Sequence, residues 1–474
     1  MDINYWKIPN DLDKVLKEYQ GEIVTRFPPE NSGYLHIGHY KALMINYVIA
    51  KKYNGKMILR FDNTNPITES QEYETVIMDD IQHLNIIPDQ ITYSSDYFPQ
   101  LINYAEMLLI NHQAYVDDTP QEQSKYQRRN GIESINRNNT VDHNMKLWQS
   151  MKDGSLQACL RLKTIMNHTI GNCRDPAIFR VVDKEHYKIK DLKIFPTYDF
   201  VCPIIDSLEG VTFAFRSVEY SDRTEQYKII LNALNLTGPK LFYYGKVKFE
   251  NIVLSKRKIK ALIEQGHIQD WDDPRLFTLR GLFNHGLHLD ALNQFASTLG
   301  FSSKTPPIMN TDKLWHINKK VIDPIAKRYF CIATDQAVMK NVLNITDYQK
   351  TIPYYIKNPS LGSRSLIMMD QIWINQNDIE DEITLMFWSH AFIQDDIILN
   401  PGDIKNTKKI PWLSQPINVK IQKCIHMNII TTDYLGESDL LNLDVSDYVQ
   451  FIKMNYYMCT KVDIVNQTVW FIEC

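Results

Sequence analysis

The chain has 474 residues, and 44% of them are hydrophobic, which is enough for about three domains with buried cores. Its 52 basic and 56 acidic side chains give a formal net charge of −4, so overall positive charge does not mark it as a nucleic-acid binder. No apolar run reaches the roughly 18 residues of a membrane helix, the N-terminus has no apolar leader, and the seven cysteines stand singly. We therefore expect no membrane contact, no secretory or transit peptide, no zinc knuckle, and a reducing compartment.

The first part of the chain alternates between helix and strand patterns. Apolar residues at helical spacing predict a helix over 11–19, and the apolar run at 23–27 predicts a strand. The same patterns then predict a helix over 40–53, a strand over 57–61 and a helix over 73–84. This alternation favours βαβ units with a parallel sheet, whose ligands bind beyond the carboxyl ends of the strands.

Composition changes near residue 117. From 119 to 144 the chain is rich in Gln, Asn, Arg and Lys and poor in aliphatic residues, and strand-like runs follow at 159–164 and 179–182. Apolar strand character of the first kind returns at 194–200. The α/β fold is therefore expected to be split by an insertion of roughly 75 residues, which is longer than an ordinary loop.

The rest of the chain predicts helices followed by strands. Residues 256–300 have helical patterns. Beyond about residue 312 the chain consists of short alternating segments separated by Pro, Gly and Asn, for example 366–374, 417–421 and 469–472. This pattern is typical of an all-β region of one or two barrels.

A tetrad with two histidines stands where the first predicted strand gives way to a helix. It reads His36-Ile37-Gly38-His39. Two imidazoles one helical turn apart at a helix start can hold a nucleotide phosphate, and Gly38, without a Cβ, lets an adenine ring approach the backbone. The alternative is that both histidines are structural side chains with satisfied hydrogen bonds.

A basic segment far downstream is the natural partner of that tetrad. It reads Leu254-Ser255-Lys256-Arg257-Lys258 and follows an apolar run. The ammonium of Lys256, on its flexible stem, can follow the charge on a migrating phosphate. The alternative is a solvent-exposed surface lysine.

Three more charged residues are candidates for binding a small zwitterion. Asp62 closes a predicted strand and suits an α-amino group, although an aspartate before Asn-Thr-Asn-Pro also forms turns. Arg26 and Arg216 are the candidate cations. Arg216 lies in an apolar stretch where an unpaired guanidinium is costly, and a substrate carboxylate would satisfy it by a bidentate pair. The alternative is a salt bridge from Arg216 to Glu219 or Asp222.

Taken together, the motifs resemble those of a class I aminoacyl-tRNA synthetase, and specifically a glutamyl-tRNA synthetase of the eukaryotic and archaeal type. They occur in the family's order and at its spacing, and the resemblance is strongest over residues 23–330. The segments that carry it are 24–30, 36–39, 59–62, 115–120, 196–200, 207–212, 254–258 and 271–275.

The resemblance implies an α/β Rossmann-like catalytic domain with an α+β insertion, a helical stem-contact segment and C-terminal β-barrels. The expected domains are an N-terminal extension (1–22), the Rossmann-like domain (23–116 and 191–250), an acceptor-stem-binding insertion (117–190), a helical stem-contact domain (251–311) and anticodon-binding β-barrels (312–474).

The resemblance also implies the reaction, which is ATP-dependent ligation of L-glutamate to the 3′-terminal adenosine of tRNA(Glu) through a glutamyl-adenylate. Mg²⁺ would enter with ATP, without a metal site in the protein. Activation of glutamate would require bound tRNA, and the 2′-hydroxyl would attack the adenylate. We expect a cytoplasmic monomer, with other synthetases or translation factors as candidate protein partners.

The residues that match the family's motifs receive roles by resemblance. His36, His39 and Lys256 would be catalytic. The ATP-binding positions would be Pro29, Glu30, His36, Gly38, His39, Ser217, Lys246, Val247, Leu254, Ser255 and Lys256. The glutamate-binding positions would be Arg26, Asp62, Tyr198 and Arg216, and Asp222 would face the tRNA acceptor stem.

The choice between glutamate and glutamine depends on Arg216. In the related glutaminyl enzymes the matching position holds a small uncharged residue, typically Cys. A charged hydrogen bond between a buried arginine and a γ-carboxylate contributes about 1.5–3 kcal/mol, and a site with two arginines and no acidic partner would reject glutamine. Two positions depart from the family pattern: Asn63 replaces a common Asp, and Leu254 stands where many members have Met.

Three alternatives to this function stay open at the level of sequence. One is a glutaminyl-tRNA synthetase, and a second is an adenylating enzyme of the same fold that does not charge tRNA through its anticodon. The third is an inactive tRNA-binding or regulatory protein.

Overall fold

The computed structural model describes residues 2–302, 308–346, 348–400 and 407–474. It divides into two compact units. The first consists of Met1–Phe249, Leu254–Ala261 and Ala296–Met309, and the second of Glu250–Val253, Leu262–Phe295 and Asn310–Cys474. None of the helices in the described ranges is long and apolar enough to cross a membrane.

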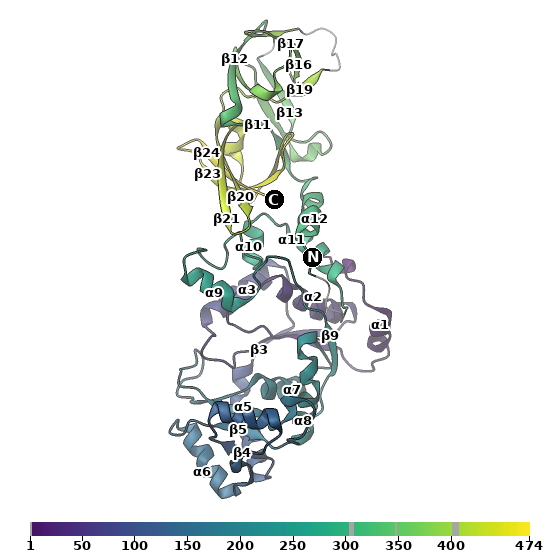
Figure 1. The fold of residues 1–474 in the computed structure, drawn as a ribbon. Coiled ribbons are helices and arrows are strands. Elements are labelled where there is room, and N and C mark those ends of the chain that lie inside the picture. The colour runs from purple at the N-terminus through teal and green to yellow at the C-terminus, as the bar shows by residue number, and fades with distance from the viewer. Residues whose placement is uncertain (1, 303–307, 347, 401–406) are drawn as a thin grey trace. The chain divides into compact units, whose positions relative to one another are not determined.

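A parallel β-sheet forms the centre of the first unit (Figure 1). β1 pairs with β2 and β2 with β3, while β8 pairs with β9, all in parallel. The N–H of Thr212 donates to the carbonyl oxygen of Val24 (3.0 Å), so β8 begins beside β1 and the strand order is β3-β2-β1-β8-β9. The strands are β1 (Val24–Phe27), β2 (Lys56–Phe61), β3 (Gln90–Tyr93), β8 (Phe213–Ser217) and β9 (Lys240–Tyr244).

This order is that of a doubly wound α/β sheet, in which the ligand site lies where the order reverses, between β1 and β8. The predicted strands at 23–27 and 57–61 are confirmed as β1 and β2. Both are almost entirely buried, as expected of parallel strands covered on both faces. The Rossmann-like catalytic fold expected from the motifs is therefore confirmed.

The helices predicted over 11–19, 40–53 and 73–84 are confirmed as α1, α2 and α3. The helices that lie wholly in the first unit are α1 (Asn10–Lys17), α2 (Ile37–Lys52), α3 (Gln71–His83), α4 (Phe98–Ile110), α5 (Gln121–Asn130), α6 (Val141–Lys152), α7 (Tyr198–Leu208) and α8 (Thr224–Ala233). Two more, α9 (Lys256–Glu264) and α11 (Leu289–Leu299), are divided between the two units.

The insertion has an antiparallel sheet of its own, with the order β4-β5-β6-β7. Its core contains Trp148, which packs edge-on against Phe179. The strands are β4 (Ala114–Asp117), β5 (Cys159–Leu162), β6 (Ala177–Val181) and β7 (Ile194–Pro196).

The strand expected at 194–200 is correct only in its first half. β7 ends at Pro196 and pairs with β6 of the inserted sheet, not with the parallel sheet. Thr197 makes the last contacts with β6, because its N–H donates to the carbonyl oxygen of Ile178 and its hydroxyl to that of Ala177 (2.8 and 2.9 Å). Its own carbonyl oxygen accepts from the N–H of Val201 (3.0 Å), and α7 begins at the next residue.

The second unit contains two barrel-like sheets, which confirms the predicted β-barrels. The larger has the order β10-β22-β23-β24-β20-β21-β11. Its two edge strands, β10 (Lys327–Tyr329) and β11 (Cys331–Ala333), are consecutive in the chain, so Phe330 alone joins the two ends of the curled sheet. The other strands of this sheet are β20 (Ile417–Ile425), β21 (Asn428–Gly436), β22 (Tyr448–Phe451), β23 (Tyr456–Asp463) and β24 (Thr468–Glu473).

The smaller barrel-like sheet has the order β15-β12-β18-β17-β16-β19. Beyond its last strand, Leu413 exchanges two backbone hydrogen bonds with Trp373 of the first strand (2.7 and 2.9 Å), which draws the two edges together. Its strands, with the separate hairpin β13–β14, are β12 (Ala337–Leu343), β13 (Gln349–Pro353), β14 (Ser363–Ile367), β15 (Gln371–Asn375), β16 (Glu382–Leu385), β17 (His390–Ile393), β18 (Ile397–Leu399) and β19 (Lys408–Ile410).

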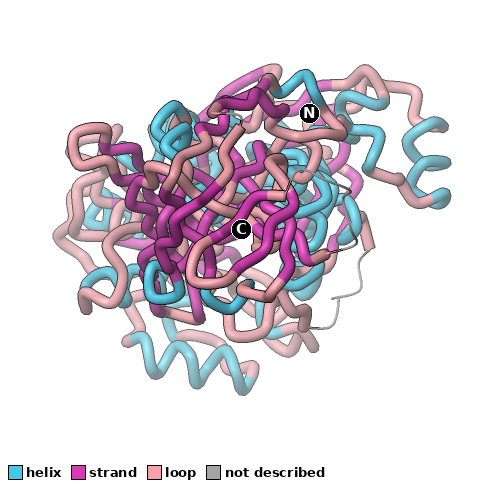
Figure 2. Tube along the Cα trace, turned by 90° about the horizontal axis from the view of Figure 1, so that it is seen from above, coloured by secondary structure: helices cyan, strands magenta, loops and turns pink. Residues whose placement is uncertain are grey.

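Figure 2 shows the strands of these sheets in magenta around the C-terminus. Two predictions for this region are wrong in detail. Residues 312–322, placed at the start of the all-β region, form α12 (Asp312–Ile322), which with α10 (Leu279–Asn284) lies in the second unit. The stretch 366–374 is interrupted by a turn after β14 and is not one strand.

A buried carboxylate ties the parallel sheet to α7. Asp206, which is 0% exposed, accepts hydrogen bonds from Nε of Arg26 (3.0 and 3.2 Å) and Nη1 of Arg60 (2.7 Å). The hydroxyl of Tyr227 on α8 also donates to it (2.9 Å). Burial alone would raise the pKa of Asp206, but Arg26 and Arg60 lower it to about 2. Asp206 is therefore shared by an arginine of β1 and an arginine of β2, and Nε of Arg60 also donates to Glu209 (2.9 Å).

We expect Asp206→Asn to reduce the free energy of unfolding by about 3–5 kcal/mol, because it leaves the buried guanidinium of Arg26 without a counter-charge and leaves Arg60 paired with Glu209 alone. Urea unfolding followed by circular dichroism measures the loss. The control is Glu22→Gln, which breaks the half-exposed pair with Lys56 (3.1 Å) and should cost less than about 1 kcal/mol. Equal losses in the two variants would contradict the structural role of Asp206.

Candidate active site

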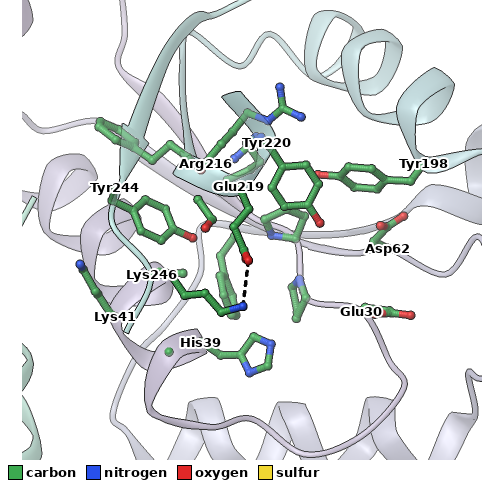
Figure 3. A pocket seen from close by; sticks show the side chains of 18 of the residues that line it. Glu30, His39, Lys41, Asp62, Tyr198, Arg216, Glu219, Tyr220, Tyr244 and Lys246 are labelled. Carbon is green, nitrogen blue, oxygen red and sulfur yellow. Dashed lines mark hydrogen bonds and ion pairs between the residues drawn. The ribbon is translucent and has the colours of Figure 1, made fainter. Parts of the chain in front are cut away.

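A cavity of about 720 Å³ opens at the carboxyl ends of β1, β2, β8 and β9 (Figure 3). It brings together residues from segments up to 229 positions apart in the chain, as the strand order predicts. The sequence-predicted residues that line it are Arg26, Pro29, Glu30, His36, Gly38, His39, Asp62, Tyr198, Arg216, Ser217, Lys246, Val247, Leu254 and Ser255. Lys256 and Asp222 are not among its lining residues.

Arg216 is a buried cation without a counter-charge. It is the penultimate residue of β8 and is 5% exposed, and in the described part of the chain neither its Nε nor its Nη1 has a hydrogen-bond partner. The predicted alternative, a salt bridge to Glu219 or Asp222, is wrong. Glu219 pairs with Lys246 (2.9 Å), as the dashed line in Figure 3 shows, and Asp222 accepts a hydrogen bond from Asn172 (2.9 Å).

Two aromatic rings hold the guanidinium of Arg216 in place. Its Cζ lies 5.2 Å from the ring centroid of Tyr220 and 5.3 Å from that of Tyr227. Cation–π contacts of this kind position a guanidinium without occupying its N–H donors. The donors of Arg216 therefore stay available for a carboxylate that enters the cavity.

Arg26 lines the same cavity but is already compensated. Asp206 binds its Nε, and its Nη1 donates to the carbonyl oxygen of Phe215 (3.1 Å). The expectation of two arginines without an acidic partner is therefore wrong for Arg26. No local motif reveals this pair, because the partner lies 180 residues downstream.

Asp62 and Glu69 give one side of the cavity an acidic character. Burial, together with the nearby Glu30, raises the pKa of Asp62 to about 7. Burial and the proximity of Asp62 raise the pKa of Glu69, a residue that sequence reasoning missed, to about 9. Asp62 is thus more than a turn former, since its buried carboxyl faces the cavity beside Tyr198, on the right of Figure 3. A ligand ammonium placed there would favour the ionised carboxylate.

Lysines lie on the opposite side of the cavity, on the left of Figure 3. Lys41 is buried, its Nζ donates to the carbonyl oxygen of Gly245 (2.8 Å), and burial lowers its pKa to about 8. The sequence analysis did not identify Lys41. Its position one turn after Ile37, among apolar residues of α2, could have indicated that this lysine is buried. With Lys246 it makes this side suitable for anionic groups.

The two histidines of the tetrad cap α2. Nδ1 of His36 accepts from the N–H of Gly38 (3.0 Å), and Nδ1 of His39 accepts from the N–H of His36 (3.1 Å). A Cβ on Gly38 would lie 2.8 Å from Cε1 of His36, so glycine is also needed for this cap. The helix consequently starts three residues earlier than predicted.

The histidines are uncharged hydrogen-bond donors. Burial, reinforced by Lys256, lowers the pKa of His36 to about 3 and that of His39 well below its usual value. Since both Nδ1 atoms accept hydrogen bonds, each proton belongs on Nε2. The capping and the phosphate-binding interpretations are therefore compatible, because capping uses Nδ1 and leaves Nε2–H to donate.

Lys256 begins α9 and contacts the loop after β1. Its Nζ donates to the carbonyl oxygen of Glu30 (2.8 Å) and to Oγ of Ser32 (3.3 Å). Burial lowers its pKa to about 8, although Glu30 and Glu69 oppose this shift. It is therefore not a freely exposed surface lysine, and its contacts lie at the edge of the cavity.

The cavity as a whole is polarised. Asp62 offers a site for a cationic group and Arg216 a site for a carboxylate, while the neutral histidines and the lysines offer donors for phosphates. No three His, Cys, Asp or Glu side chains within the described ranges are grouped to hold a metal ion. The geometry suits one ligand with an ammonium and a carboxylate beside a second ligand with several phosphates.

The sequence comparisons agree with this geometry. Residues 22–324 match the family described as "tRNA synthetases class I (E and Q), catalytic domain". Residues 326–428 match the family "tRNA synthetases class I (E and Q), anti-codon binding domain".

Similar proteins carry names from the same family. A "Probable glutamate--tRNA ligase, cytoplasmic" of Vairimorpha ceranae is 39% identical over 94% of this chain and 79% of its own. A "Glutamate--tRNA ligase, cytoplasmic" of Arabidopsis thaliana is 36% identical over 93% and 68%. A "Bifunctional glutamate/proline--tRNA ligase" of Mus musculus is 38% identical over 91% of this chain, which spans only 30% of that longer protein. The chain belongs to the class I glutamyl- and glutaminyl-tRNA synthetases.

Proposed function

We propose that this protein is a glutamate--tRNA ligase, which joins L-glutamate to the 3′-terminal adenosine of tRNA(Glu). The observation that carries the choice of amino acid is Arg216, which lines the cavity and has two buried guanidinium nitrogens without a partner among the described residues. A γ-carboxylate compensates this charge, whereas the neutral amide of glutamine leaves it unpaired. Family membership and the names of the relatives support the same reaction.

Glutamate binds with its three charged groups in separate places. Its γ-carboxylate pairs with Arg216 and its α-ammonium with Asp62, beside Tyr198. Arg26 shapes the floor of the site but offers little charge, since Asp206 compensates it. The α-carboxylate is left to face the α-phosphate of ATP.

ATP lies at the β1–α2 turn, as MgATP, with Mg²⁺ entering as part of the substrate. The Nε2–H donors of His36 and His39 contact its phosphates, and the adenine lies beside Gly38, near Lys246 and Val247. Pro29, Glu30, Ser217, Leu254 and Ser255 complete the site. An oxygen of the glutamate α-carboxylate attacks the α-phosphorus, the bond to the β-phosphate oxygen breaks, and pyrophosphate leaves. Lys256 stabilises the charge that develops on the phosphates.

The second step transfers glutamate to tRNA. The 2′-hydroxyl of the terminal adenosine attacks the carbonyl carbon of the adenylate, and AMP leaves. The inserted sheet binds the acceptor stem, with Asp222 at its edge, and the barrel-like sheets bind the anticodon. Positioning and charge stabilisation do the catalytic work, without a covalent enzyme intermediate. Because the relatives are named cytoplasmic, we place this reaction in the cytoplasm, carried out by a monomer.

Charging assays with glutamate and with glutamine, each with and without total tRNA, test this function together with ATP–pyrophosphate exchange. We expect glutamyl-tRNA to form, and exchange to require both glutamate and tRNA. Charging of glutamine alone would identify a glutaminyl enzyme. Exchange without charging would identify an adenylating enzyme of the same fold, and tRNA binding without either activity would identify a regulatory protein.

We expect Arg216→Cys to lower kcat/KM for glutamate by at least about 100-fold, or 2.7 kcal/mol, because it removes a buried cation that lines the cavity and has no carboxylate partner among the described residues. Arg216→Lys, which keeps the charge but not the bidentate geometry, should give an intermediate loss. Steady-state charging measures both, with the KM for ATP as internal control. A loss below about threefold in the Cys variant would make Arg216 structural.

The fall of kcat/KM for glutamate at low pH should follow the protonation of Asp62. Its carboxyl, with a pKa near 7, must be ionised to bind an ammonium, so kcat/KM for glutamate should be highest above about pH 7 and fall about tenfold per pH unit below it. Asp62→Asn should lower the activity and remove this fall at low pH. Charging rates at saturating MgATP and tRNA across the pH range measure it. If kcat/KM of Asp62→Asn still falls at low pH as in the wild type, a group other than Asp62 is responsible for the pH dependence.

A further inference from the structure

The connection between β6 and β7 reaches out of the inserted sheet to the active-site loops. These strands pair directly at Val181 and Ile194, so a tight hairpin turn would suffice to join them. Residues 182–193 instead form a long irregular segment, here called the β6–β7 loop. A loop of this length with buried anchor residues usually has a function.

His186 anchors the β6–β7 loop next to Asp62. Nδ1 of its buried ring accepts from the N–H groups of Lys188 and Ile189 (both 3.1 Å), so its proton belongs on Nε2. Nε2 lies 3.0 Å from the carbonyl oxygen of Asn63 and donates to it. Burial lowers the pKa of His186, which keeps this arrangement uncharged.

Tyr187 joins three separate segments through its hydroxyl. Nδ2 of Asn31 (2.7 Å) and Nδ2 of Asn63 (3.2 Å) donate to it, and it donates to Oε2 of Glu74 (2.9 Å). Lys188 holds the other oxygen of Glu74 (3.3 Å). All the capacity of this phenol is thereby used in one fixed arrangement.

The two asparagines bound by Tyr187 belong to two different loops of the cavity. Asn31 follows Glu30, whose carbonyl oxygen accepts from Lys256, in the loop that lies at the ATP site. Asn63 follows Asp62 in the loop that lies at the glutamate site. Both side chains are completely buried. Tyr187 is therefore the bridge between the loop that would hold one substrate and the loop that would hold the other.

The departure of Asn63 from the family's common Asp fits this bridge. Its Nδ2 donates to Oγ of Ser95 (2.8 Å) as well as to Tyr187, and its Oδ1 accepts from the N–H of Ser95 (2.9 Å). A carboxylate could accept but could not supply the two donations. The amide is thus the group that satisfies every partner at this position.

We propose that Tyr187 is a positioning residue that fixes the distance between the ATP loop and the glutamate loop, and so makes the inserted module part of the catalytic geometry. The inference rests on the proposed function. In-line attack requires the α-carboxylate and the α-phosphorus to be held at a fixed separation, and each loop alone places only one of them. Loosening the bridge therefore lowers the rate of the chemical step more than the binding of either substrate.

Tyr187→Phe tests this, because it removes the hydroxyl and keeps the ring. In charging assays with saturating tRNA we expect kcat to fall about tenfold, while KM for ATP and KM for glutamate change less than about threefold. The control is Tyr53→Phe, which removes the hydrogen bond of another half-buried phenol to a carboxylate, Asp13, and should leave kcat within about twofold of wild type.

A second variant distinguishes the loss of this hydrogen bond from a general destabilisation of the fold. Glu74→Ala removes the acceptor of the Tyr187 hydroxyl and should lower kcat in the same way, and adding Tyr187→Phe should lower it further by less than about twofold. An unchanged kcat in Tyr187→Phe, KM values that rise as much as kcat falls, or multiplicative effects in the double variant would each overturn the inference. Wild-type charging is measured first, so a failure of the proposed function is seen before any variant is compared.

Discussion

The first unit depends on one buried carboxylate. Asp206 binds Arg26 and Arg60 at the centre of the parallel sheet, where neither arginine could remain charged without a partner. It fixes the side chains of two adjacent strands against α7. Its pairing with Arg26 also means that this cation of the cavity has a counter-charge, whereas Arg216 has none among the described residues. Arg26 and Arg216 line the same cavity, yet among the described residues only Arg26 has a carboxylate partner.

This division of charge follows from the strand order. Parallel strands end at the same edge, so β1, β2 and β8 bring the histidine tetrad, Asp62 and Arg216 to one cavity although they are distant in the chain. The acidic and basic groups fall on different sides because they follow different strands. In the proposed function, the sheet thus separates the site for the ammonium from the site for the phosphates, and the two substrates it positions need little further catalysis beyond charge stabilisation.

The amino-acid sequence predicted much of this arrangement because its features are local. Alternating patterns identified β1, α2 and β2, and the tetrad identified residues that line the cavity. What could not be predicted depends on contacts between distant segments. The pairing of Arg26 with Asp206 is of this kind, and so are the buried acid Glu69 and the bridge at Tyr187. The error at 194–200 is similar, because an apolar run does not reveal which sheet it joins or that a helix begins at Tyr198.

In the proposed function, discrimination between glutamate and glutamine, which are nearly isosteric, requires an unpaired buried cation that is unfavourable in the enzyme without ligand. A guanidinium that is 5% exposed with two unpaired nitrogens is unfavourable without a ligand, and the rings of Tyr220 and Tyr227 compensate only part of its lost hydration. The neighbouring arginines add no such cost, because Asp206 pairs with Arg26 and both Asp206 and Glu209 pair with Arg60. A bound γ-carboxylate offsets this unfavourable free energy through charged hydrogen bonds. The side-chain amide of glutamine has an oxygen that would accept hydrogen bonds without neutralising the cation, and its NH₂ group would lie against another donor of Arg216. In the proposed function, selectivity for a carboxylate is therefore already present in the unliganded cavity, because Arg26 is paired with Asp206 and Arg216 has no such pair among the described residues.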